Sequence, residues 1–268
     1  MNVVSVFSEV AVVVSLLLAV GVAGIVGPDR IRSELPALRT RLRQAARPLL
    51  LLGAVLAANS VVRDFGVGLS WLIGSNITKT IYAIEGSFVA SLQSLAPAWF
   101  TLYLGFVYVY GYAFLLVFPL VLTLLLANTR YLKETAFAYT VNYVIGLLCY
   151  VLFVAYGPRN FAPDTVEPLL YDTIPRFQLV TSQVNANTNV FPSLHTSLSV
   201  TVALMAYRLR AEYPRWLPVA TCLAGSVVLS TMVLGIHWAT DVVFGVLLGA
   251  LSVYVATRPR FHSENESS

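Results

Sequence analysis

Charged residues are scarce in this chain of 268 residues. Aspartate, glutamate, lysine and arginine together make up only 11% of the sequence, hydrophobic residues make up 57%, and the mean hydropathy is +0.76. An ordinary soluble domain is about 25% charged, and a core of this size could not bury so much apolar surface. The composition therefore excludes a soluble globular protein and an intrinsically disordered one.

Cysteine and lysine are also nearly missing. The two cysteines, Cys149 and Cys222, both fall within apolar runs, so the sequence does not indicate a disulfide framework. The net charge of +4 comes mostly from arginines that occur in short clusters between apolar runs. Because these clusters do not form one basic face, we expect no nucleic-acid partner.

Long apolar runs dominate what is present. A membrane-spanning helix needs roughly 20 mostly apolar residues, and seven segments are candidates, of which the second and fifth are short. They run over about Val3–Val26, Pro48–Val62, Thr101–Leu126, Thr135–Tyr156, Ser193–Tyr207, Trp216–Leu234 and Trp238–Thr257. Residues 66–100 are only moderately apolar and contain Lys79 and Glu85, so an interfacial helix, a re-entrant segment and an eighth element all remain open.

These runs predict an all-α, polytopic transmembrane helix bundle of about six or seven spans. We expect residues 1–268 to form a single integral membrane domain. Within it, residues 1–100 supply N-terminal helices and an amphipathic or re-entrant segment, residues 101–257 form a helical core that carries the chemistry, and residues 258–268 form a polar tail.

The cations predict the topology. With seven spans and an external N-terminus, 13 of the 17 cationic residues fall on inner segments, namely residues 27–47, 127–134, 208–215 and the tail from 258. This is the positive-inside pattern of a multi-pass protein of the cell membrane. We expect the N-terminus outside and the C-terminus inside. Four cations are left on the outer side: Arg63, Lys79, Arg159 and Arg176.

Two of the three histidines mark a candidate site. His195 and His237 each lie at the outer end of a predicted span, whereas His262 lies in the tail. Asp241 follows His237 by four residues, which places both on one face of a helix, where a carboxylate can orient an imidazole. Either histidine alone could be a packed, hydrogen-bonded residue. No third ligand has suitable spacing, so we expect no metal site.

The residues around both histidines resemble a known family. Phe-Pro-Ser-Leu-His at 191–195, followed by Gly-Ile-His-Trp-Ala-Thr-Asp-Val at 235–242, resembles the second and third motifs of the type 2 phosphatidic acid phosphatase superfamily, which includes the vanadium haloperoxidases. The resemblance covers about residues 130–257. Leu194 stands where many of the phosphatases have glycine, and in this it is similar to the inositol phosphorylceramide synthase branch, which transfers a phosphoryl head group between lipids.

Two parts of the family pattern are different here. Ser230-Thr231 stands where the third motif usually has Ser-Arg, and the first motif, a lysine followed seven residues on by Arg-Pro, is absent as such. Arg159, within Tyr-Gly-Pro-Arg-Asn at 156–160, is the best substitute for a first-motif cation by its position. Arg176 is a candidate replacement for the lost arginine. Both arginines could instead be ordinary loop charges.

The resemblance implies a family helical core in the C-terminal half and a metal-independent phosphoryl transfer through a phosphohistidine, with no cofactor. In this scheme His237 is the nucleophile, Asp241 orients it, and His195 acts as general acid and then base. Phosphate binding would fall to Arg159, Ser193 and Arg176. Ser193 is also a candidate helix cap, and the loop 157–192 should pack over the site.

Three functions remain open. The first is a membrane lipid phosphatase that hydrolyses a lipid phosphate. The second is a head-group transferase of the inositol phosphorylceramide synthase type, which the leucine at position 194 favours. The third is a non-enzymatic transporter or membrane scaffold, but both histidines and Asp241 lie at one predicted surface, whereas transport sites usually lie near the membrane midplane. The expected partners are a lipid phosphate and membrane lipids, and the sequence does not indicate an oligomeric state.

Overall fold

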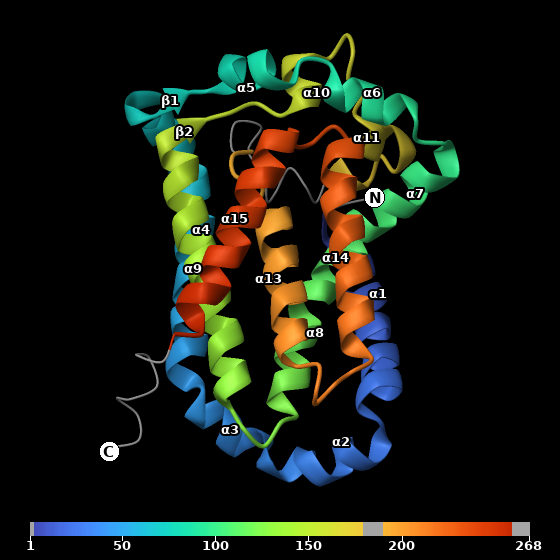
Figure 1. The fold of residues 1–268 in the computed structure, drawn as a ribbon, viewed down its shortest axis with the longest axis vertical. Coiled ribbons are helices and arrows are strands. Elements are labelled where there is room, and N and C mark those ends of the chain that lie inside the picture. The colour runs from blue at the N-terminus through green and yellow to red at the C-terminus, as the bar shows by residue number, and fades with distance from the viewer. Residues whose placement is uncertain (1–2, 179–189, 259–268) are drawn as a thin grey trace.

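The computed structural model describes residues 3–178 and 190–258, apart from the side chains of residues 61–67. Long helices stand side by side in a bundle, and short helices lie across both ends (Figure 1). The long helices are α1 (Val3–Gly21), α4 (Ala46–Ile73), α7 (Ala98–Phe106), α8 (Tyr112–Leu124), α9 (Arg130–Leu152), α13 (Leu194–Arg208), α14 (Trp216–Val233) and α15 (Ala239–Ala256). The predicted all-α class and bundle architecture are confirmed.

Short elements connect the long helices. A π-helical turn, η1 (Val22–Val26), extends α1, and another, η3 (Val107–Gly111), joins α7 to α8. One end of the bundle carries α2 (Pro28–Glu34), η2 (Leu35–Ala37) and α3 (Leu38–Gln44), and the opposite end carries α5 (Thr78–Glu85), α6 (Phe88–Ser94), α10 (Pro158–Phe161) and α11 (Leu169–Thr173). There, β1 (Ser75–Asn76) and β2 (Phe153–Val154) pair in parallel, with Ser75 opposite Phe153.

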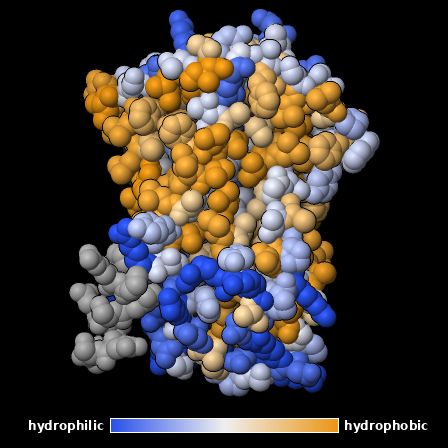
Figure 2. All heavy atoms as spheres, in the orientation of Figure 1, coloured by the Kyte–Doolittle hydropathy of each residue, from blue (hydrophilic) through white to orange (hydrophobic). Residues whose placement is uncertain are grey.

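Five of the seven predicted spans are helices long and apolar enough to cross a membrane: Val3–Val26, Ala98–Leu124, Arg130–Leu152, Trp216–Val233 and Ala239–Ala256. The two segments that the sequence marked as short are also helical. One is α4, whose apolar part covers Ala46–Ser60, and the other is α13, which has 15 residues. A wide apolar band crosses the bundle on the face that Figure 2 shows.

Residues 66–100 do not form one separate element. The helix α4 continues to Ile73, and β1, α5 and α6 then follow as short pieces at the end of the bundle (Figure 1). Gly86 ends α5 with a φ of 54°, a backbone conformation that glycine adopts without a steric penalty. These pieces do not form an eighth long helix, and an interfacial or re-entrant position of this stretch in the membrane stays a prediction.

The helix α13 lies at the centre of the C-terminal half, where it packs against α8, α9, α14 and α15. Its buried partners include Phe118 of α8 and Trp216 of α14. Close packing against α15 requires glycine, because a Cβ at Gly245 would lie 2.7 Å from the backbone oxygen of Ser193. This contact brings the first turns of α13 and α15 together.

An ion-pair cluster around a buried carboxylate joins α9 to α13 at the end opposite α5. The carboxylate of Glu134 is buried and accepts hydrogen bonds from Arg130 at 2.7 Å and from Arg208 at 3.1 Å. A buried carboxylate needs such partners. Hydrophilic residues gather at this end, where α2 and α3 lie (Figure 2). The predictions for residues 179–189 of the long loop and for the tail beyond residue 258 lie outside the described residues.

Candidate active site

The turn between α14 and α15 positions His237. Gly235 has a φ of 69°, and a Cβ there would lie 2.9 Å from a side-chain carbon of Val166, so only glycine fits this turn. The backbone N–H groups of Ile236 and His237 both donate to the carbonyl oxygen of Thr231 at 3.0 Å. The chain thus leaves α14 in a fixed turn that places His237 just before α15.

Asp241 lies beside His237, as the spacing of four residues predicts. Its Oδ2 atom is 3.4 Å from Nδ1 of His237 and accepts a hydrogen bond of 2.9 Å from the backbone N–H of Trp238. The second bond caps the first turn of α15. Both side chains are buried. In this arrangement Nδ1 of His237 faces the carboxylate, and the imidazole forms a further hydrogen bond with the backbone of Val190.

His237 lies in the turn between two membrane spans, and burial lowers the pKa of its imidazole to about 3. A hydrogen bond with the backbone of Val190 opposes this shift, and the nearby Arg159 guanidinium adds to it. A buried imidazole favours its neutral form because the charged form loses hydration. A neutral imidazole has the free electron pair that a nucleophile needs.

His195, on the first turn of α13, faces His237. The centroids of the two rings are 6.3 Å apart, with an angle of 54° between the ring planes. Two tyrosines hold His195 in place: its ring stacks on Tyr108 at a centroid distance of 4.5 Å and lies 4.2 Å from the ring of Tyr112. Aromatic contacts of this kind fix the orientation of a ring.

Ser193 begins α13 as the predicted cap. Its Oγ atom accepts a hydrogen bond of 3.3 Å from the backbone N–H of Thr196, and its own N–H donates to the carbonyl oxygen of Asp241 at 3.1 Å. The hydroxyl is buried. Ser193 therefore ties the helix of one histidine to the helix that carries the carboxylate of the other.

Arg159 is attached to the same turn. The N–H of Arg159 donates to the carbonyl oxygen of Gly235 at 3.1 Å. The Nη2 atom donates to the hydroxyl of Tyr171 at 2.9 Å, and the guanidinium carbon lies 4.5 Å from the centroid of that ring. The Nη1 atom is buried and has no hydrogen-bond partner in the structure. An unpartnered buried guanidinium N–H is costly, and a phosphate oxygen would satisfy it.

Arg176 is engaged elsewhere. Its Nη2 atom lies 2.9 Å from a carboxylate oxygen of Glu9 on α1, and that carboxylate also accepts a hydrogen bond from the hydroxyl of Tyr110. Phosphate binding by Arg176 stays a prediction, and it would require the arginine to leave Glu9. The competing carboxylate lies 167 positions away in the sequence, so sequence reasoning had no signal for it.

Four residues near the site were not among the sequence candidates: Glu85, Tyr108, Tyr112 and Tyr171. For Glu85, the only signal in the sequence is an acidic residue within a moderately apolar segment. The three tyrosines cannot be distinguished in the sequence from the aromatic residues that anchor spans at the membrane interface.

Among the described residues, no three His, Cys, Asp or Glu side chains lie close enough together to hold a metal ion.

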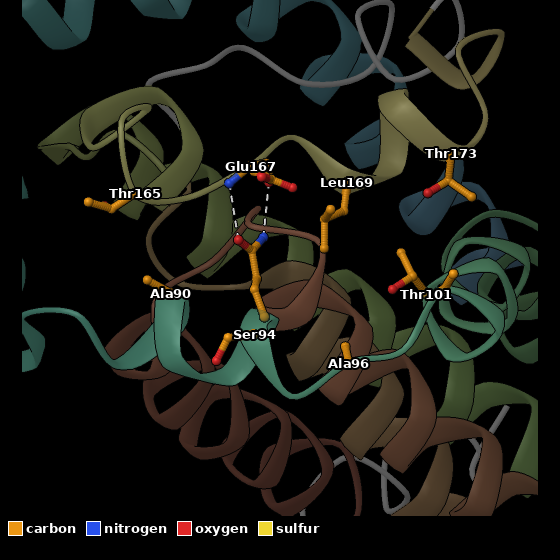
Figure 3. A pocket seen from close by; sticks show the side chains of 10 residues that line it. Ala90, Ser94, Ala96, Thr101, Thr165, Glu167, Leu169 and Thr173 are labelled. Atoms are coloured by element: carbon orange, nitrogen blue, oxygen red, sulfur yellow. Dashed lines mark hydrogen bonds between the residues drawn. The ribbon is translucent and has the colours of Figure 1, made fainter.

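A cavity of about 430 Å³ lies on the same end of the molecule, between α6, α7 and the segment 165–173 (Figure 3). Gln93 forms part of its wall and joins the two sides. Its Nε2 atom donates to the carbonyl oxygens of Glu167 at 2.9 Å and Val233 at 3.0 Å. The lining contains neither histidine and no cationic side chain, so it does not match a phosphate site.

The apolar helices define the class of the fold, a membrane-embedded helical bundle, and at one end of it the rings of His195 and His237 face each other. Comparison with known families identifies the family, because the family model of the PAP2 superfamily matches residues 82–255, more than half of the chain. The chain belongs to the PAP2 superfamily, and this membership supports a phosphatase-like activity on lipid phosphates in general. Neither the curated proteins nor the solved structures contain a match.

Proposed function

We propose that this protein is a membrane enzyme that transfers the phosphoryl group of a lipid phosphate through a phosphohistidine intermediate on His237. One observation carries the proposal: the rings of His195 and His237 face each other at 6.3 Å, with Asp241 beside the second ring. Two imidazoles at this distance can act on the two sides of one phosphoryl group.

In the first step, Nε2 of His237 attacks phosphorus in line, a nitrogen–phosphorus bond forms, and the bond from phosphorus to the lipid oxygen breaks. The charge of the bound anionic phosphate favours the protonated form of His195, which gives its proton to that leaving oxygen. Asp241 accepts the Nδ1 proton in a hydrogen bond and supports the positive charge that develops on the ring. The lipid alcohol leaves, and the phosphoryl group stays on His237.

In the second step, neutral His195 takes a proton from a water molecule or an acceptor alcohol, whose oxygen attacks phosphorus. The nitrogen–phosphorus bond breaks and His237 returns to its neutral form. Throughout, the Nη1 atom of Arg159 would donate to an equatorial phosphoryl oxygen. The buried Ser193 hydroxyl and the N-terminus of α13 add hydrogen-bond donors for the same oxygens. This role of Arg159 is supported by its buried, unpartnered Nη1 atom.

Transfer to a lipid alcohol instead of water is the second candidate, and Leu194 is the observation that favours it. The side chain of Leu194 is buried, and one of its methyl carbons would lie 2.5 Å from a Cβ placed at Gly146 of α9. Because Gly146 has no side chain, it leaves space on α9 for the side chain of Leu194, the residue before His195. The inositol phosphorylceramide synthase-like branch remains a proposal that rests on this residue.

The test is phosphate release from phosphatidic acid by the detergent-purified protein in the presence of a chelator. We expect activity in the wild type and a loss of ~10³-fold or more in His237→Ala. Product analysis with and without an added lipid alcohol separates hydrolysis from transfer. Full activity of the double variant His195→Ala, His237→Ala would refute the mechanism. A wild type that neither releases phosphate nor binds a phosphate analogue would favour the transporter or scaffold.

A further inference from the structure

Glu85 connects a short helix at the end of the bundle with the first turn of α15. It is the last residue of α5, and its Oε2 atom accepts a hydrogen bond of 2.8 Å from the backbone N–H of Ala239. Its Oε1 atom accepts a second bond from the N–H of Thr240. These are the first two residues of α15, whose N–H groups have no partner within the helix.

Two carboxylates from separate elements therefore share the start of α15. Asp241 binds the N–H of Trp238 from within the helix, and Glu85 binds the next two N–H groups from outside it. Because His237 directly precedes Trp238, the position of the His237 backbone depends on how firmly these hydrogen bonds hold the turn. The negative charge of Glu85 also suits the positive end of the helix dipole.

The helix α5 is itself held firmly against the site. The ring of Tyr82 lies 5.9 Å from the ring of Trp238, and the indole N–H of Trp238 donates to the carbonyl oxygen of Tyr156 at 2.8 Å. Ile81 is buried among the same group of residues. The opposite face of α5 is open, and Ile84 is 71% exposed. One face of α5 thus packs on the catalytic turn while the other points outwards.

We propose that Glu85 is a positioning residue for the nucleophile: by holding the first two amides of α15, it keeps the turn that carries His237 in the orientation required for in-line attack. This inference rests on the proposed phosphoryl transfer. Glu85 itself does not bind the phosphate, because both of its oxygens accept bonds from backbone amides and a carboxylate repels an anion.

Two inhibitors separate positioning of the nucleophile from stability of the fold. Vanadate binds by forming a bond to the attacking nitrogen, whereas inorganic phosphate binds through hydrogen bonds and charge alone. An inhibition constant does not depend on how much of the protein is active, so a variant that only folds less well keeps both constants. The experiment compares both constants in the full-length, detergent-purified wild type, Glu85→Gln and Glu85→Asp.

The matched control is Asp164→Asn, which removes one exposed carboxylate at the same end of the molecule. In Glu85→Gln we expect a tenfold or larger rise in the vanadate inhibition constant and less than a twofold change for phosphate, because a glutamine amide can accept from only one of the two N–H groups. Glu85→Asp should recover part of the loss. Asp164→Asn should match the wild type.

The inference is overturned if Glu85→Gln keeps the wild-type inhibition constant for vanadate, whether or not its maximal rate falls. It is equally overturned if both constants rise together, since Glu85 would then act on phosphate binding. A wild type with no phosphatase activity and no inhibition by vanadate points instead to failure of the proposed function.

Discussion

At the scale of single residues, the candidate site depends on the state of one imidazole. His237 has to be neutral to attack phosphorus, and burial lowers its pKa to about 3. The charged form is favoured only below that pKa, so the nucleophilic form persists throughout the physiological range and is lost only in strong acid. Among the residues that the structure describes, Asp241 from α15, His195 from α13, Arg159 from α10 and the backbone of Val190 lie near this ring.

The first prediction concerns this titration. The protein is labelled with nitrogen-15 histidine, and the signal of His237 is assigned by its loss in His237→Gln. This signal should remain that of a neutral imidazole from pH 8 down to about pH 5, because burial disfavours the charged form. Nuclear magnetic resonance in detergent micelles measures it. A midpoint near the ordinary histidine value of about 6.5 would show that the ring is hydrated or strongly charge-paired, which contradicts the site described above.

The second prediction concerns Arg159, whose Nη1 atom is buried without a partner. Arg159→Ala should lower kcat/KM for a lipid phosphate by roughly 10–100-fold, the usual effect of losing a charge-assisted hydrogen bond. Arg159→Lys should recover only part of this, because lysine lacks the planar fork. Tyr171→Phe serves as control, since it keeps the ring under the guanidinium and removes one hydrogen bond. Unchanged kinetics in Arg159→Ala would assign phosphate binding to another cation.

At the scale of helices, the site exists because α13 and α15 start side by side. Gly245 permits this approach: a Cβ there would lie 2.7 Å from the oxygen of Ser193 and 2.9 Å from Cβ of Thr196. The contact also lets the N–H of Ser193 reach the carbonyl oxygen of Asp241. Separation of the two helices would therefore move His195 away from His237.

The third prediction follows from this contact. Gly245→Ala should destabilise the fold by about 1–3 kcal/mol, the usual cost of overpacking, and should reduce activity because the two first turns move apart. Gly225→Ala on α14 is the matched control, since a Cβ there meets nothing within 4 Å and alanine favours helix. Thermal unfolding in detergent compares the two. A Gly245→Ala protein as stable as the control would mean that α13 and α15 tolerate a wider separation.

The sequence predicted the helices and the contacts between residues close together in the chain. It could not predict the contacts between residues that are far apart in the chain. Long apolar runs predict the helices. The spacing of His237 and Asp241 predicts that the two lie close together, but His237 lies in the turn before α15 instead of on the helix, and the capped turn makes the contact. The stacking of Tyr108 on His195, the pairing of Arg176 with Glu9 and the two bonds of Glu85 all join residues far apart in the chain. Each of these depends on how whole helices pack, which no single segment encodes.

At the scale of the whole molecule, charge and apolar surface separate along the bundle. The middle carries an apolar band, and hydrophilic residues gather at the end with α2 and α3 (Figure 2). Arg32, Arg39 and Arg43 are exposed on these helices. The positive-inside rule assigns such an end to the cytoplasm. We therefore propose that the opposite end, with the two histidines, faces outwards.

The fourth prediction tests this orientation. In a background with Cys149→Ser and Cys222→Ser, a cysteine introduced by Asp164→Cys should react with an impermeant thiol reagent added to whole cells. Gln44 on α3 is also exposed, and a cysteine introduced there by Gln44→Cys should react only after the cells are opened. The reverse result would place the candidate site on the cytoplasmic face and would contradict the expected topology.

The most direct test of the central claim, the fifth prediction, is to trap the intermediate. The wild type is mixed with a lipid phosphate, stopped in alkali, where a phosphohistidine survives, and digested for mass spectrometry. The account predicts a phosphoryl group on His237 and none in His237→Ala, with His195→Ala showing a slower appearance of the label because the general acid is missing. A protein that turns over its substrate while His237 stays unmodified, or that remains active as His237→Ala, would contradict the account.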